Sequence, residues 1–181
     1  PGFWRQPERM AAAFDEEGFY RSGDALRFAD PADPNAGMIF DGRITEDFKL
    51  DTGTWVSVGT LRHRIIAAGK GLVQDAVITG HDQSFLGAIV FPDVNYCRQL
   101  SGLGTEASLP ELIAHPAVRD ALQRTLDEMA PSSTGSATLI RRALFAWFTL
   151  SIDAGEITDK GTINQRAVLA SRRAAVELLY A

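Results

Sequence analysis

The chain has 181 residues and a formal net charge of −5, with 45% hydrophobic and 23% charged residues, which is the composition of an ordinary soluble globular protein. The negative charge argues against nucleic acid and anionic membranes as main partners, because both attract dense lysine and arginine clusters, and no apolar run approaches the roughly 20 residues that span a bilayer. The only cysteine, Cys97, excludes an internal disulfide and fits the reducing cytoplasm, where we expect this protein to work.

The first part of the chain is predicted to form a helix and a hairpin. Residues 6–14 favour a short helix, and residues 19–29 favour a strand. The Pro, Asn, Asp and Gly residues over 30–37 predict a turn that leads to a second strand at 38–40. The acidic residues of this turn lack the offsets of an EF-hand, so we predict no metal there.

A new unit is predicted after Arg43, with strands and helices interleaved. The predicted elements are two short strands within 48–58 about a turn at 51–54, a helix at 59–68, antiparallel strands at 73–79 and 85–91, a helix from 108, a second helix from 116, a loop at 131–138, a strand at 139–150 and a last helix at 163–180. This order predicts an α+β domain: a short, mostly antiparallel sheet flanked by helices.

A polar segment near the chain end is the most informative feature of the sequence. It reads Glu-Ile-Thr-Asp-Lys-Gly-Thr-Ile-Asn-Gln-Arg over 156–166 and places Lys160 beside a glycine. Thr162 and Gln165 have the spacing of a capping box, which would start the last helix. The ammonium group of Lys160 would then lie on a tether outside the cap, free to reach a site built by another part of the protein. The alternative is a solvated surface lysine.

Two further residues are predicted to meet at the ends of the first hairpin. Asp24 follows a glycine within the first predicted strand, and Arg43 follows a glycine at the end of the paired strand. A carboxylate accepts hydrogen bonds from two adjacent hydroxyls, as on a ribose, and an arginine donates to a sugar or a phosphate. The alternative is an exposed ion pair worth less than ~1 kcal/mol.

Four segments that follow one another along the whole chain indicate a protein family. They are Pro-Gly-Phe-Trp-Arg-Gln-Pro-Glu at 1–8, Tyr-Arg-Ser-Gly-Asp at 20–24, Asp-Gly-Arg-Ile-Thr-Glu-Asp-Phe-Lys at 41–49 and the lysine segment. Together they resemble the adenylate-forming acyl-CoA synthetase superfamily. Residues 48–59 and 155–166 are similar to its feruloyl-CoA synthase group.

The resemblance covers the whole chain and implies its domain organisation. Residues 1–44 would be the terminal segment of a large adenylation domain, and residues 45–181 the small mobile C-terminal domain. The sequence does not begin with methionine, and we interpret it as part of a longer polypeptide whose missing N-terminal domain is its partner. The isolated fragment would be inactive, because no Gly-rich phosphate-cradling loop occurs in it.

The resemblance also implies an activity: an ATP-dependent acid–thiol ligase acting on ferulate or a related hydroxycinnamate. The carboxylate attacks the α-phosphate of ATP to give an acyl-adenylate, and the thiol of CoA then displaces AMP. Asp24 would hold the ribose hydroxyls, Arg43 would contact ribose or phosphate, and Lys160 would bridge the carboxylate and the α-phosphate. ATP chemistry implies Mg²⁺, whose ligands would lie outside this chain.

Between the two steps the resemblance implies a rotation of the small domain about Thr45. The rotation would remove Lys160 and present the segment from Lys49 to Trp55, in which Gly53 would let the CoA arm pass close to the backbone. One departure concerns the lysine. The superfamily lysine follows a glycine, whereas here the glycine follows the lysine, and strict spacing would place Thr162 in its column. We favour Lys160, because a threonine supplies no charge.

Several alternatives stay open at this point. The enzyme could activate a fatty acid, or pass its acyl group to a carrier-protein thiol instead of CoA. The chain could also be a stand-alone, non-catalytic binding module. The three histidines, His63, His81 and His115, share no metal-ligand spacing, so we predict packing or solvated roles for them. The identity of the acid and the oligomeric state cannot be inferred from the sequence.

Overall fold

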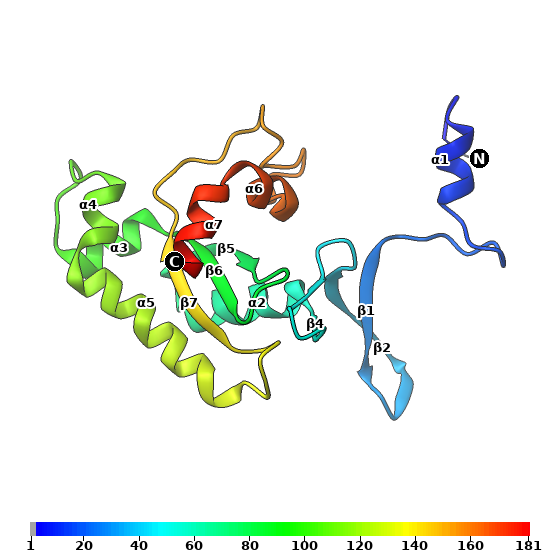
Figure 1. The fold of residues 1–181 in the computed structure, drawn as a ribbon, viewed down its shortest axis with the longest axis horizontal. Helices are drawn as coiled ribbons and strands as arrows, with labels where there is room; N and C mark the ends of the chain where they lie inside the picture. Colours follow the sequence, from blue (N-terminus) through cyan, green and yellow to red (C-terminus); the bar gives the residue numbers. More distant parts are fainter. Residues whose placement is uncertain (1–2) are drawn as a thin grey trace. The chain divides into compact units, whose positions relative to one another are not determined.

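A computed structural model describes residues 3–181 and divides the chain between Thr45 and Glu46 into two compact units (Figure 1). Each unit has its own elements, and each is described separately below. Two points stay predictions: residues 1–44 are the end of a larger adenylation domain, and residues 45–181 move as one body.

The first unit contains one short helix and one hairpin. The helix α1 spans Pro7–Ala12, and the strands β1 (Asp24–Asp30) and β2 (Asp33–Arg43) pair antiparallel. The hairpin loop is only residues 31–32, so the predicted turn over 30–37 is wrong. Its polar residues pair as strand, while Asp30 and Asp33 each accept a hydrogen bond from the N–H two residues on, at 2.8 and 2.9 Å.

The hairpin exposes large apolar side chains. Leu26, Phe28, Met38 and Phe40 are all exposed, at 45–62% of their surface. The first unit has no buried apolar residue among those described for α1, β1 and the outer part of β2. Contiguous exposed apolar surface of this kind is typical of a face that another domain covers.

The second unit is built around a three-stranded sheet with the order β5-β6-β7. Its elements, in chain order, are β3 (Phe48–Lys49), β4 (Trp55–Val56), α2 (Val58–Ala68), β5 (Val73–Thr79), β6 (Leu86–Pro92), α3 (Val94–Ser101), α4 (Leu109–Ala114), α5 (Pro116–Met129), η1 (Ala130–Ser132), β7 (Ile140–Phe145), α6 (Gln165–Ser171) and α7 (Arg173–Tyr180). β5 and β6 pair antiparallel, and β6 and β7 pair parallel. The predicted α+β class with a short, mostly antiparallel sheet is confirmed.

Both faces of this sheet are buried. Along β5, Ala76 and Ile78 belong to one core and Val77 to another, which is the alternation of a strand between two layers. The first core includes side chains of α2 and α5, and the second includes Val168 of α6 and Leu179 of α7. The site elements described below are therefore fixed to a sheet covered by helices on each side.

The second unit differs from its predicted elements at β7, at the last predicted helix and at α3. The predicted strand 139–150 ends at Phe145, and the predicted helix 163–180 is two helices that break at Arg172. The helix α3 was not predicted at all. Its N-cap is Asp93, whose carboxylate accepts a hydrogen bond from the Tyr96 N–H at 2.7 Å.

Candidate functional site

Lys160 lies at the tip of a small hairpin between β7 and α6. Ile157 and Ile163 form an antiparallel bridge, and the Thr158 N–H donates to the Thr162 carbonyl oxygen at 2.8 Å. The N–H of Gly161 donates to the Thr158 carbonyl oxygen at 2.8 Å, which closes a tight turn. The φ of Gly161 is +76°, a conformation that glycine adopts without steric cost. Lys160 is exposed at this turn, as the sequence predicts for a tethered cation.

The predicted capping box of Thr162 and Gln165 is wrong. The side chain of Asn164 caps α6 by accepting a hydrogen bond from the Ala167 N–H at 3.3 Å. Gln165 is buried instead, and its Oε1 accepts a hydrogen bond from the Ile78 N–H of β5 at 3.0 Å. The base of the hairpin is therefore joined to the central sheet.

A buried carboxylate anchors the start of this hairpin. The side chain of Glu156 is fully buried, and its oxygens accept hydrogen bonds from Arg172 Nε and Nη2 at 2.7 and 2.9 Å. Ser171 Oγ and the Ser151 N–H donate to the same carboxylate at 2.5 and 2.7 Å. The Asn164 N–H donates to the Glu156 backbone carbonyl at 2.8 Å. Both arms of the Lys160 hairpin are thus tied to the junction of α6 and α7.

The same contacts determine the ionisation of Glu156. The hydrogen-bonded Arg172 guanidinium lowers the pKa of Glu156 from 4.5 to about 2, assisted by Ser171 and Ser151 and opposed by burial. The pair also raises the pKa of Arg172. Reasoning from the sequence missed Glu156, because nothing in the sequence marks which glutamate is buried or that Arg172 interrupts a helix.

Asp24 and Arg43 are brought together, as predicted. They are opposite each other in the register of β1 and β2, at the open end of the hairpin. The alternative of a plain ion pair is not what the structure shows, since neither residue takes part in an ion pair within residues 3–181.

The segment from Lys49 to Trp55 forms the predicted turn between β3 and β4. Lys49 and Trp55 are register partners and both exposed, and the Lys49 ammonium lies 6.0 Å from the centre of the Trp55 ring. Gly53 has a φ of +77° and open space where a Cβ would stand. This hairpin and the hairpin with Lys160 are separate features of the second unit (Figure 1). Thr45 is exposed, at the last position of the first unit.

The described residues contain few other candidate groups. Residues 3–181 include no cluster of three or more His, Cys, Asp or Glu side chains that could hold a metal ion. Over the same range, every helix is too short or too polar to cross a membrane. Cys97 is buried, and burial raises the pKa of its thiol to about 11, assisted by Asp93, so the thiol is protonated at neutral pH.

Comparison with known proteins decides the family. The sequence profile of the AMP-binding enzyme C-terminal domain matches residues 49–181, nearly all of the second unit. The chain belongs to this family. The exposed Lys160 hairpin and the β3–β4 hairpin are accordingly features of an AMP-binding C-terminal domain.

The relatives of this AMP-binding domain include carboxylic acid reductases. The chain is 28% identical over 184 residues to carboxylic acid reductase from Segniliparus rugosus, covering 100% of the chain but 14% of that protein. The A-PCP didomain of that enzyme, in complex with AMP, matches with a TM-score of 0.69 and 25% identity over 100% of the chain and 23% of its own length. The adenylation domain of the Mycobacterium chelonae carboxylate reductase matches in fold, with a TM-score of 0.71 and 23% identity over 99% of the chain and 26% of its own length.

These coverages bound what the comparisons say. The chain spans about a seventh of the curated relative and about a quarter of the matched structures. The match to the family profile shows the family, and the matched structures show the fold. The feruloyl-CoA synthase group, the acid and the acceptor are matters for the proposal below.

Proposed function

We propose that this chain is the C-terminal part of an ATP-dependent enzyme that activates a carboxylic acid as an acyl-adenylate and then transfers the acyl group to a thiol. The family supports the adenylate-forming step, since it is the C-terminal domain of AMP-binding enzymes. The S. rugosus relative, a carboxylic acid reductase whose structure contains AMP, supports a carboxylic acid as substrate.

In the first step, Lys160 is the proposed catalytic cation. A carboxylate oxygen bonds to the α-phosphorus of ATP, the bond to the bridging oxygen breaks, and pyrophosphate leaves. Two anions must meet, so an ammonium between them stabilises the charge of the transition state. An exposed lysine on a turn held by a buried ion pair supports this role, because the cation is free while its base is fixed.

For the nucleotide, Asp24 and Arg43 are the proposed contacts. The Asp24 carboxylate would accept hydrogen bonds from the two ribose hydroxyls, and Arg43 would donate to ribose or phosphate. Their adjacency in the hairpin, and the absence of an ion pair of either within the described residues, support this assignment. ATP chemistry implies Mg²⁺, and we assign its ligands to the part of the enzyme outside this chain.

In the second step, the β3–β4 hairpin would replace Lys160 at the site. The thiolate of the acceptor attacks the acyl carbon, and AMP leaves with the electron pair of the broken bond. Thr45 is the proposed hinge, at the division between the two units. Gly53 has no side chain and open space beside it, which supports passage of the acceptor arm past the turn. The exposed apolar face of β1 and β2 supports a larger domain packed against the first unit.

For the acid and the acceptor, we propose a hydroxycinnamate such as ferulate, and CoA. The likeness of residues 48–59 and 155–166 to the feruloyl-CoA synthase group supports this choice. The second candidate is a carrier-protein thiol as acceptor. The match to an A-PCP didomain of carboxylic acid reductase favours it.

The single observation that carries the proposal is the family match over residues 49–181. The experiment measures acid-dependent AMP release by the complete enzyme with ATP and Mg²⁺, against a panel of hydroxycinnamates, benzoates and fatty acids, with and without CoA. We expect CoA-dependent turnover concentrated on hydroxycinnamates. Pyrophosphate exchange without CoA-dependent turnover would favour the carrier-protein acceptor, and no AMP release with any acid would favour a non-catalytic binding module.

A further inference from the structure

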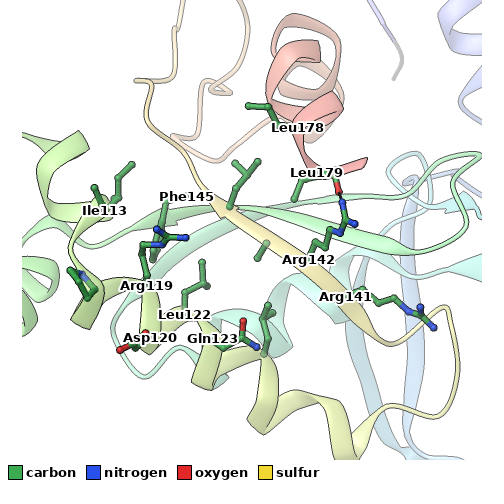
Figure 2. Close-up of a pocket in the computed structure, with 15 residues that line it drawn as sticks. Ile113, Arg119, Asp120, Leu122, Gln123, Arg141, Arg142, Phe145, Leu178 and Leu179 are labelled. Carbon is green, nitrogen blue, oxygen red and sulfur yellow. Dashed lines mark hydrogen bonds between the residues drawn. The ribbon is translucent and has the colours of Figure 1, made fainter. Parts of the chain in front are cut away.

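A groove runs along β7, on the second unit, and none of the residues that line it is assigned to the reaction. Its volume is about 700 Å³, and it lies between α5 and α7, with the end of α4 at one side. Figure 2 shows β7 passing between the two helices, with Arg119 of α5 directed toward the strand and Leu178 and Leu179 of α7 on the other side. The groove is a feature of the AMP-binding domain that the reaction leaves unused.

The wall of the groove is the free edge of a strand. All five residues from Arg141 to Phe145 line the groove. Because the side chains of consecutive strand residues point to opposite faces of the sheet, five consecutive residues can line one groove only where it follows the edge of the strand. Within residues 3–181, β7 pairs with β6 and with no other strand. The Ala146 N–H donates to the Val90 carbonyl oxygen of β6 at 2.8 Å. By alternation along the regularly paired part of the strand, the backbone N–H and C=O groups of Ala143 and Phe145 point to the open side.

The rim of the groove is rich in arginine. Arg119 and Arg141 are exposed and take part in no ion pair within the part of the chain that the structure describes. Arg142 is already engaged, because its Nη1 donates to the carbonyl oxygens of Leu179 and Ala181, both at 2.9 Å. Asp120 is the one acidic residue among the lining side chains. The rim therefore attracts negative charge.

The floor of the groove is apolar. Leu122 is buried, Leu126 and Leu144 are half-buried, and Leu178 is 60% exposed. An occupant with alternating apolar and acidic side chains would match the floor and the rim at once, because alternate residues of a strand face opposite sides.

We propose that this groove binds an extended acidic peptide segment, which pairs with β7 as a fourth strand. The free backbone groups of the edge select an extended backbone, and the arginines select its charge. A second copy of the chain fits less well, because two paired β7 edges would bring their arginines together. The inference does not depend on the proposed reaction.

The test uses the full chain and a labelled six-residue peptide, acetyl-Val-Glu-Val-Glu-Val-Glu-amide, the length of β7. Fluorescence anisotropy gives the dissociation constant, and amide chemical shifts locate the peptide. We expect saturable binding that weakens as salt is raised, with the largest shifts in residues 140–145. The same peptide with lysine in place of glutamate should bind at least tenfold more weakly, and a version with proline at the third and fifth positions should not bind.

Variants sharpen the test. The double variant Arg119→Glu/Arg141→Glu should weaken binding of the acidic peptide about tenfold, because it replaces both unpaired rim cations with anions that repel the peptide. Arg124→Glu is the control, because Arg124 is exposed on α5 but does not line the groove. Equal binding of the lysine peptide, shifts outside β7, or no binding at millimolar peptide would overturn the proposal. Concentration-dependent dimerisation through β7 would show that a second copy is the occupant, and would overturn it as well.

Discussion

The two lysine-bearing hairpins of the second unit differ in their main anchors. The β3–β4 hairpin is fixed by apolar side chains: Phe48, Leu50 and Val56 are buried in the main core. The hairpin of Lys160 buries one apolar side chain, Ile163, in the second core, and its main polar anchor is the buried carboxylate of Glu156, which accepts four hydrogen bonds. The difference teaches that a short loop can be fixed either by burial of apolar area or by an ion pair, and that only the second depends on pH.

The largest effect on stability is expected from breaking the ionic anchor. Glu156→Gln should lower the free energy of unfolding by about 3 kcal/mol, because it leaves the Arg172 guanidinium without its charged partner. Urea denaturation of the full chain measures this. The control is Glu177→Gln on the exposed face of α7, which should change stability by less than about 0.5 kcal/mol. A loss of the same size in both variants would contradict a special role for the ion pair.

Acid should act on the same anchor. The folded-state pKa of Glu156 is lowered from 4.5 to about 2, so its contribution to stability is complete above pH 4.5 and is lost as the pH falls toward 2. We expect the free energy of unfolding to fall across this window in the unmodified chain, and to fall less in Glu156→Gln. Denaturation curves at pH 6, 4 and 3 provide the measurement. Parallel pH profiles of the two proteins would rule out this account.

The apolar anchor should show a smaller loss without the pH dependence. Val56→Ala removes two buried methyl groups and should cost about 2 kcal/mol. Because no charge is involved, the difference from the unmodified chain should be the same at pH 6 and pH 3. A difference that shrinks in acid would show that the two hairpins share one anchor.

The smallest effect is expected at the turn of the β3–β4 hairpin. Gly53→Ala places a side chain at a φ of +77° with no clash nearby, so it should cost about 1 kcal/mol from backbone strain alone. Gly104→Ala is the matched control, because Gly104 has no positive φ and the same open space. Thermal denaturation of the two variants compares them. Equal melting temperatures would show that the turn relaxes.

The sequence predicts most of the fold because the apolar patterns are strong. The helix predicted from 108, the helix predicted from 116 and the antiparallel strands predicted at 73–79 and 85–91 are all confirmed. The prediction of a turn over 30–37 is wrong because polar residues of that segment pair as strands. The prediction of one helix over 163–180 is wrong because the helix breaks at Arg172.

The candidate site is predictable only in part. The adjacency of Asp24 and Arg43 follows from two strands of one hairpin, and the turn between Lys49 and Trp55 follows from its residues. The anchor of the Lys160 hairpin cannot be predicted in this way. Glu156 and Arg172 are 16 positions apart and meet through tertiary packing, which no local sequence pattern determines. Gln165 shows the same limit: its spacing fits a cap, but burial gives it a partner in β5.

We propose that Lys160 acts in adenylate formation and not in acyl transfer. The most direct measurement compares the two half-reactions in the complete enzyme: acid-dependent pyrophosphate exchange, and thioester formation from supplied acyl-adenylate. Lys160→Ala should lower the first at least about 100-fold and leave the second nearly unchanged, whereas Thr162→Ala should change neither by more than a few-fold. Equal loss of both half-reactions in Lys160→Ala, or loss of exchange in Thr162→Ala alone, would contradict the account.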